Sequence, residues 1–194
     1  RGRFDHLDHK GRAAPRQIVG GAHAAEELAD HADMGAGRGH EPARLRQMAE
    51  AACAAARAAE PTLVVRLLHA AEAHAADVLA ADGYLFATPE NLAAISGQLK
   101  DFFDRCYYGA LDQINGRPYA LLVCAGSDGQ NAARQMARIA TGWRLNAVAE
   151  PLIVCTHAQT PEAILAPKHI GADDLARCQA LGEALAVGLA LGVF

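Results

Sequence analysis

The sequence predicts a three-layer α/β domain built on an open parallel sheet. From about residue 45 onward, short apolar segments alternate with segments of helical period, a pattern typical of strand–helix–strand crossovers. The apolar segments are nearly continuous, which indicates strands with helices over both faces. A chain of 194 residues suffices for one such domain, and we expect residues 45–194 to form it.

Four strands and four helices are expected in this part of the chain. The strands are predicted at residues 63–68, 84–87, 119–125 and 152–155. The helices are predicted at residues 46–59, 92–106, 132–143 and from 173 to the chain end, mostly because apolar residues recur there every three or four positions. The first helix is almost all alanine on its inner face, so we expect it to pack close to the sheet.

Residues 1–44 show no such pattern. Their longest apolar run is Ile18 and Val19, and seven glycines interrupt the segment. We assign it no element, and the central first strand of the sheet is therefore uncertain or missing. His6 and His9 have a metal-compatible spacing, but no Cys or carboxylate pattern completes a site, so we expect no metal centre.

Composition limits the classes of function. A formal net charge of −4 argues against a general nucleic-acid binder, which needs a basic surface. The longest apolar stretch, residues 184–194, is much shorter than the roughly 20 residues of a membrane-spanning helix. Five scattered cysteines without a C-x-x-C pair predict reduced thiols in a cytoplasmic protein. Among them, we interpret Cys124 and Cys155 as small core residues.

Two turns follow predicted strands at the edge where open parallel sheets bind ligands. The first turn consists of Thr88, Pro89, Glu90, Asn91 and Leu92, and the second of Gly126, Ser127, Asp128 and Gly129. Each is expected to lead into a helix, whose first backbone N–H groups can donate to carbonyl oxygens or anions. A flat heteroaromatic ring carrying carbonyls would fit between them. Pro and Gly are also ordinary turn residues, so plain connections remain an alternative.

Three segments carry a family resemblance. They are ADGYLFATPENLAAISGQLKDFFDRCYY, NGRPYALLVCAGSDG and TGWRLNAVAEPLIV. They resemble the flavodoxin-like NAD(P)H-dependent flavin reductases and quinone reductases, in which a strand ends in T-P-x-Y/N and the next helix carries S-G-x-L-K-x-F-x-D-R. The resemblance covers about residues 46–194. It implies that the nine turn residues contact the isoalloxazine ring of FMN and that no protein side chain need be assigned as a catalytic acid or base.

The resemblance implies an FMN-dependent oxidoreductase that transfers electrons from NAD(P)H to a quinone or another small acceptor, and relatives are often homo-oligomers. One alternative is a flavodoxin-type electron carrier between proteins, although such carriers typically sandwich the flavin with loop aromatics and neither turn contains one. The other alternative is a folded remnant that no longer binds flavin.

The chain departs from the family before its first predicted helix. A hydroxyl- and glycine-rich loop of the kind S-x-T-G-x-T should hold the FMN phosphate there, but residues 42–45 are Pro-Ala-Arg-Leu. GC-rich codons for residues 33–45, read one nucleotide later, permit TWALVVATSRRGS, a strand followed by such a loop. We therefore hypothesise that residues 1–44 come from a shifted reading frame, and we expect the chain to purify with little or no FMN.

Overall fold

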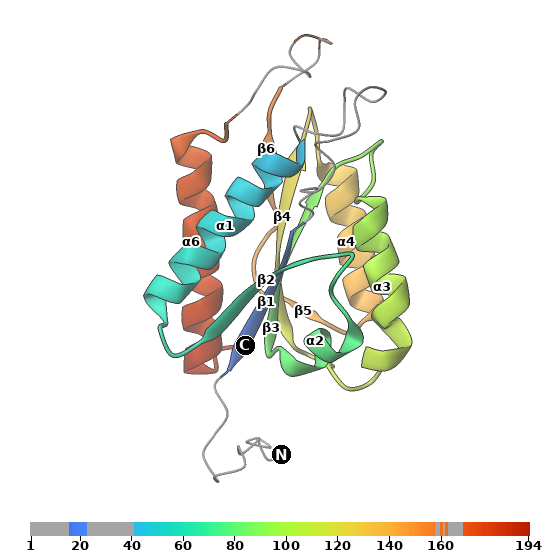
Figure 1. Cartoon of the computed structure of the whole chain (residues 1–194), viewed down its shortest axis with the longest axis vertical. Coiled ribbons are helices and arrows are strands. Elements are labelled where there is room, and N and C mark those ends of the chain that lie inside the picture. The colour runs from blue at the N-terminus through green and yellow to red at the C-terminus, as the bar shows by residue number, and fades with distance from the viewer. Residues whose placement is uncertain (1–15, 23–40, 158–159, 161, 163–168) are drawn as a thin grey trace.

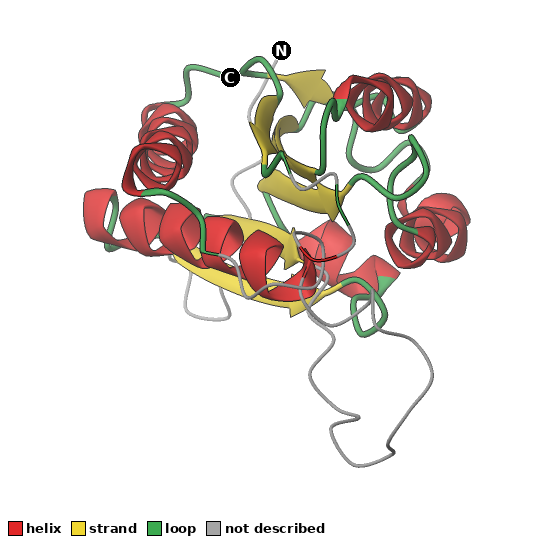
Figure 2. Ribbon diagram, turned by 90° about the horizontal axis from the view of Figure 1, so that it is seen from above, coloured by secondary structure: helices red, strands yellow, loops and turns green. Residues whose placement is uncertain are grey.

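The computed structural model describes residues 16–22, 41–157, 160, 162 and 169–194. In this part of the chain, helices cover both faces of a parallel sheet (Figures 1 and 2). One face carries α1 (Glu41–Ala59) and α6 (Ala172–Leu191), and the other carries α2 (Ala75–Ala80), α3 (Gly97–Ala110) and α4 (Gln130–Gly142). The predicted three-layer α/β architecture is confirmed.

The sheet has the strand order β2-β1-β3-β4, and the far side of β4 pairs with two short strands. Its members are β1 (Gln17–Ala22), β2 (Val64–His69), β3 (Gly83–Pro89), β4 (Pro118–Ala125), β5 (Asn146–Ala147) and β6 (Leu152–Cys155). Every pairing is parallel, so the carboxyl ends of the strands meet at one edge, at the top of Figure 1. This order is that of flavodoxin-like sheets, which bind ligands at that edge.

The centre of the sheet corrects the expectation for residues 1–44. Strand β1 lies between β2 and β3, with Ile18 opposite Val65 on one side and Gly83 on the other. Glycine is unfavourable in a strand when it leaves a gap, but a Cβ on Gly20 would lie 3.0 Å from the Cys53 sulfur of α1. The small residue therefore permits close packing. The sequence analysis left the central first strand uncertain or missing, and the structure places it at Gln17–Ala22.

The start of the first helix is also earlier than predicted. Helix α1 begins at Glu41 rather than at residue 46, so the proposed loop at 42–45 is helical. Leu45 is fully buried there. Most of residues 33–45, the segment considered for a second reading frame, lies outside the described residues.

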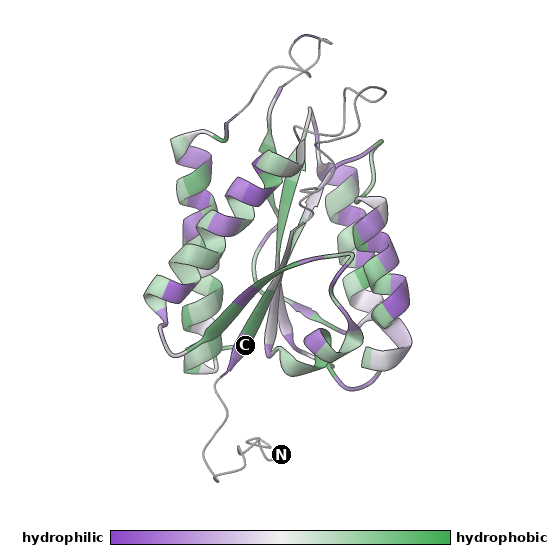
Figure 3. Ribbon diagram, in the orientation of Figure 1, coloured by the Kyte–Doolittle hydropathy of each residue, from purple (hydrophilic) through white to green (hydrophobic). Residues whose placement is uncertain are grey.

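Strand side chains alternate between two cores, one on each face of the sheet. In β4, Tyr119, Leu121 and Val123 join the core under α3 and α4, whereas Leu122 and Cys124 join the core under α1 and α6. This alternation is the ordinary two-residue period of a strand. Figure 3 shows the apolar strands between helices whose polar residues lie on their outer faces.

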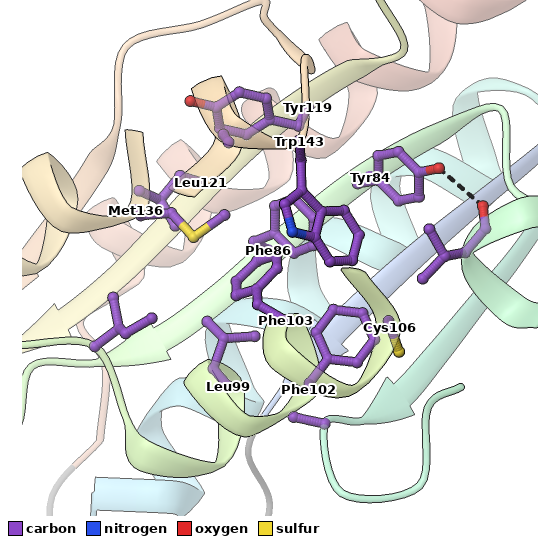
Figure 4. Packing of buried hydrophobic residues seen from close by; sticks show 14 of the residues in the cluster. Tyr84, Phe86, Leu99, Phe102, Phe103, Cys106, Tyr119, Leu121, Met136 and Trp143 are labelled. Atoms are coloured by element: carbon purple, nitrogen blue, oxygen red, sulfur yellow. Dashed lines mark hydrogen bonds between the residues drawn. The ribbon is translucent and has the colours of Figure 1, made fainter. Parts of the chain in front are cut away.

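Aromatic rings dominate the core under α3 and α4 (Figure 4). The ring of Phe103 lies edge-on to Phe86 of β3 and to Trp143, with centroids 5.1 and 5.0 Å apart. Such contacts stabilise beyond the area they bury. At the start of β3, the Tyr84 hydroxyl donates to Val78 O at 2.8 Å (Figure 4), and this bond ties α2 to the sheet.

The alanine-rich face of α1 packs closely against the sheet, as predicted. Helix α1 also packs against α6. A Cβ on Gly182 of α6 would lie 2.0 Å from Ala52 O, so the two backbones touch at this point.

No helix among the described residues is long and apolar enough to cross a membrane.

Candidate functional site

The two predicted turns lie side by side because their strands are neighbours. In β3 and β4, Thr88 is opposite Val123 and Pro89 is opposite Cys124. The turns that leave these strands therefore emerge together at the carboxyl edge of the sheet. All nine sequence-predicted residues lie in or next to these turns, and the geometry of each turn follows from its local hydrogen bonds.

The first turn is longer than predicted. Thr88 is fully buried, and its hydroxyl donates to Pro89 O at 2.9 Å and accepts from Ser96 N at 3.0 Å. The Ser96 hydroxyl in turn caps α3 by accepting from Leu99 N at 3.2 Å. Helix α3 therefore begins at Gly97, and the expectation that this turn leads directly into a helix at residue 92 is wrong. The whole Thr88 residue is buried, backbone included, so its role in this structure is to shape the turn.

Residues 91–94 form a tight hairpin above β3. Asn91 and Ala94 exchange two backbone hydrogen bonds, of 2.9 and 3.1 Å. Leu92 and Ala93, between them, have φ values of 52° and 60°. Left-handed backbone at two successive positions normally favours Asn or Gly, and costs a residue with a side chain about 1–2 kcal/mol. Leu92 is completely exposed at the tip, which explains why it does not belong to the buried stripe of α3.

The second turn is shaped by Gly129, the N-cap residue of α4. Its φ is 76°, and a Cβ there would lie 2.5 Å from Ile153 Cγ2. Only glycine fits this position without strain. Ser127 and Asp128 are exposed and Gly126 is half-buried, with open space where its Cβ would be.

Glu90 connects the two turns. Its backbone N–H donates to Cys124 O at 2.9 Å, and its carboxylate Oε2 accepts from Gly129 N at 2.8 Å. A carboxylate at a helix N-terminus is stabilised by the helix dipole. The Gly129 amide is therefore already occupied and does not face a ligand, contrary to the sequence expectation. The second carboxylate oxygen, Oε1, is buried without a hydrogen-bond partner among the described residues.

Two α4 residues that the sequence analysis did not identify also hold the first turn. The Asn131 amide donates to Ala93 O at 2.6 Å, and the Gln135 side-chain oxygen accepts from Ile95 N at 2.9 Å. These side chains are four residues apart and so share one face of the helix. Polar residues at this spacing also occur on any solvent-facing helix surface, so the sequence carried no specific signal for them.

One cysteine, Cys155, lies beside the second turn. Cys155, at the end of β6, is half-buried and lies 3.6 Å from Asp128 O. Burial raises the pKa of its thiol, and the nearby carboxylates of Asp128 and Glu90 raise it further. The thiol is therefore protonated near neutral pH. Cys124 is fully buried in the core, and none of the five cysteines forms a disulfide among the described residues. The described residues contain no cluster of His, Cys, Asp and Glu suited to a metal ion.

The edge fits the ring of a flavin. Hydrogen bonds among the described residues leave free the backbone N–H groups of Leu92, Ala93, Ser127 and Asp128. Isoalloxazine presents carbonyl oxygens and ring nitrogens that accept from such donors. The family resemblance predicts the FMN phosphate between β1 and α1, where residues 23–40 lie outside the described residues. Those residues contain no Ser or Thr, so the predicted shortage of hydroxyl donors persists.

A family model described as NADPH-dependent FMN reductase matches residues 19–160. The match begins within β1 and includes both turns. No curated protein matches the chain significantly.

Solved structures share the fold at low sequence identity. A WrbA-like flavodoxin from Agrobacterium tumefaciens superposes with a TM-score of 0.60 at 15% identity, over 92% of this chain and 99% of the other. An oxidoreductase from Corynebacterium diphtheriae gives 0.60 at 21%, over 89% and 97%. An azoreductase from Bacillus anthracis gives 0.60 at 14%, over 87% and 99%.

Proposed function

The chain belongs to the NADPH-dependent FMN reductase family, and from this we propose that it is an FMN-dependent oxidoreductase that passes electrons from NAD(P)H to a quinone or another small acceptor. The observation that supports the proposal is the joined pair of turns at the carboxyl edge, where Glu90 fixes one turn against the other. In open parallel sheets, this edge is where ligands bind.

The residues of both turns would hold and orient the flavin ring. Backbone donors at Leu92 and Ala93 would approach it from one side, and those at Ser127 and Asp128 from the other. Bound FMN would supply the chemistry, accepting hydride from NAD(P)H and releasing electrons to the acceptor. Preformed backbone donors need no reorganisation when the ring binds, which favours tight and specific orientation. No side chain at this edge is assigned a proton-transfer role.

The apolar tip of the hairpin supports a ring-binding role. Leu92 is fully exposed and has left-handed backbone, and strained backbone positions of this kind cluster at ligand sites. A planar ring between the turns would cover it.

Substitutions in the two turns test the site. We expect Asn91→Trp and Gly126→Val to weaken FMN binding and leave the fold intact, because Asn91 is exposed and a Cβ at Gly126 meets no atom within 4 Å. Gly142→Val is the matched control, since Gly142 also has open space but lies at the far end of α4. FMN affinity is measured by fluorescence quenching and the fold by circular dichroism. Unchanged FMN affinity in both turn variants would show that the two turns do not bind the flavin.

Turnover separates an enzyme from an electron carrier. With bound FMN, steady oxidation of NADPH in the presence of a soluble quinone supports the proposed function. Electron exchange only with a reductase protein would favour the carrier. Both functions require the unaltered chain to bind FMN. If it does not bind FMN at concentrations up to about 1 mM, which corresponds to a binding free energy of only about −4 kcal/mol, the enzyme and the carrier are both contradicted.

A further inference from the structure

The hairpin 91–94 is held from one side by a single helix. Three hydrogen bonds reach it or its flanks from α4: Asn131 to Ala93 O, Ile95 N to the Gln135 side chain, and Gly129 N to Glu90. On the hairpin side, Glu90 lies before the hairpin, Ala93 within it and Ile95 after it. Gly129 is the N-cap of α4, and Asn131 and Gln135 lie in its first two turns, so one rigid element supports the whole segment.

The hairpin needs this support because its own sequence does not favour its shape. Leu92 and Ala93 both have left-handed backbone, where residues with a Cβ are unfavourable. The two backbone bonds between Asn91 and Ala94 are its only internal hydrogen bonds. Strained backbone of this kind persists only where surrounding groups enforce it, and such positions cluster at ligand sites.

Gln135 is the key contact because its bond is partly shielded from water. Its side chain is half-buried, and Ile95, whose N–H it accepts, is buried. If the acceptor is removed, a buried N–H loses its partner, and the end of the hairpin must move to find another. Asn131 is exposed and also accepts from Arg134 at 3.3 Å, so water can replace its contact more readily.

We propose that Gln135, supported by Asn131, is a positioning residue that holds the strained hairpin in its flavin-binding conformation. This inference rests on the proposed function, because it assigns the hairpin to the ring. Gln135 does not touch the ring. It acts through the Ile95 amide, and it keeps the Leu92 and Ala93 donors where the ring needs them before the ring arrives.

The test uses the full chain with Gln135→Leu, which removes the acceptor at similar size. Gln135→Glu retains a side-chain oxygen and is the rescue variant. Arg138→Ala is the control, because Arg138 is exposed on the same helix and makes no hydrogen bond to the hairpin. Hydrogen exchange of the Ile95 amide is measured without flavin, and FMN affinity is measured by fluorescence quenching.

We expect at least tenfold faster exchange at Ile95 and about tenfold weaker FMN binding in Gln135→Leu, equivalent to about 1.4 kcal/mol. Gln135→Glu and Arg138→Ala should stay close to the unaltered chain in both measurements. A purely structural role would lower the unfolding temperature without changing FMN affinity, and that result would overturn the inference. Unchanged exchange at Ile95 would overturn it as well. Failure of the unaltered chain to bind FMN would instead overturn the proposed function, and the inference with it.

Discussion

Gly129→Ala should destabilise the protein more than any other single methyl added to the two turns. The new Cβ would lie 2.5 Å from Ile153 Cγ2 and 3.1 Å from Ala125 Cβ, well inside ordinary contact distance. Overpacking of this kind costs about 1–3 kcal/mol. The left-handed backbone at φ 76° costs alanine about a further 1–2 kcal/mol. We therefore expect a loss of about 2–5 kcal/mol, a large part of the roughly 5–15 kcal/mol that stabilises a domain.

Urea unfolding of the flavin-free protein measures this loss. Gly126→Ala is the matched control within the same turn. Its Cβ would meet no atom within 4 Å, so its free energy of unfolding should stay within about 0.5 kcal/mol. The double variant Gly129→Ala/Ile153→Ala removes the methyl group that clashes. A double-mutant cycle should then return a favourable coupling of about 1–3 kcal/mol, while the backbone cost remains.

The outcome separates the two physical causes. If Gly129→Ala is as stable as the unaltered protein, the turn does not have the left-handed geometry described above. If it is destabilised but shows no coupling to Ile153, the cost comes from the backbone and the predicted clash with β6 is wrong. Either result would also weaken the case that Glu90 and Gly129 fix the two turns together.

Three further predictions follow, two from burial and one from the reading frame. Burial raises the pKa of the Cys53 and Cys178 thiols to about 11. An unfolded thiol loses its proton near pH 8.5, so the free energy of unfolding should fall as pH rises from about 8.5 toward 11. At pH 8, a thiol reagent should modify half-buried Cys155 first, and rapid native-state reaction of Cys53 would contradict this. A gene encoding residues 33–45 in the frame one nucleotide later should give tighter FMN binding, by at most about 100- to 10,000-fold, because about two charge-assisted hydrogen bonds to phosphate are restored. Equal FMN affinities of the two chains would contradict the reading-frame hypothesis. A gene whose second frame does not encode the strand and loop would contradict it as well.

Strand positions were predictable because burial on both faces leaves a strong signature. The predicted strand at 152–155 coincides with β6, and that at 119–125 differs from β4 by one residue. Helix α2 and strand β5 were not predicted, because six and two residues are too few to show a period. Strand β1 was missed for a different reason. Its two adjacent glycines are acceptable only because α1 packs against Gly20, a tertiary contact that local sequence does not reveal.

The candidate site was predicted in place but not in detail. The sequence located both turns, because a strand end followed by Pro or Gly marks the edge of the sheet. It also predicted a helix from residue 92, since Leu92 continues the spacing of Ile95 and Leu99. The structure places Leu92 in a hairpin instead. Helical spacing cannot distinguish a helix from a turn that precedes one, and here the Thr88 and Ser96 hydroxyls decide where the helix begins.

The central strand now limits the reading-frame hypothesis. In the structure, β1 occupies the position between β2 and β3. The strand encoded by the second frame would require the same position, because the phosphate loop must lead from the central strand into α1. Both segments cannot occupy it together. A chain read in the second frame must therefore displace β1, and the gain in phosphate contacts would be reduced by the loss of the contacts that β1 makes.

The distribution of hydrogen bonds at the carboxyl edge follows one rule. Donors that fix the geometry of the turns are used within the protein: Gly129 N binds Glu90, and Ile95 N binds Gln135. Donors at the hairpin tip and in the exposed part of the second turn have no partner within the part of the chain that the structure describes. Rigid turns with free donors bind a planar acceptor at a lower entropic cost than mobile turns would. A plain connection would gain nothing from a strained hairpin with an exposed leucine, so this division of donors favours a ligand site over a simple turn.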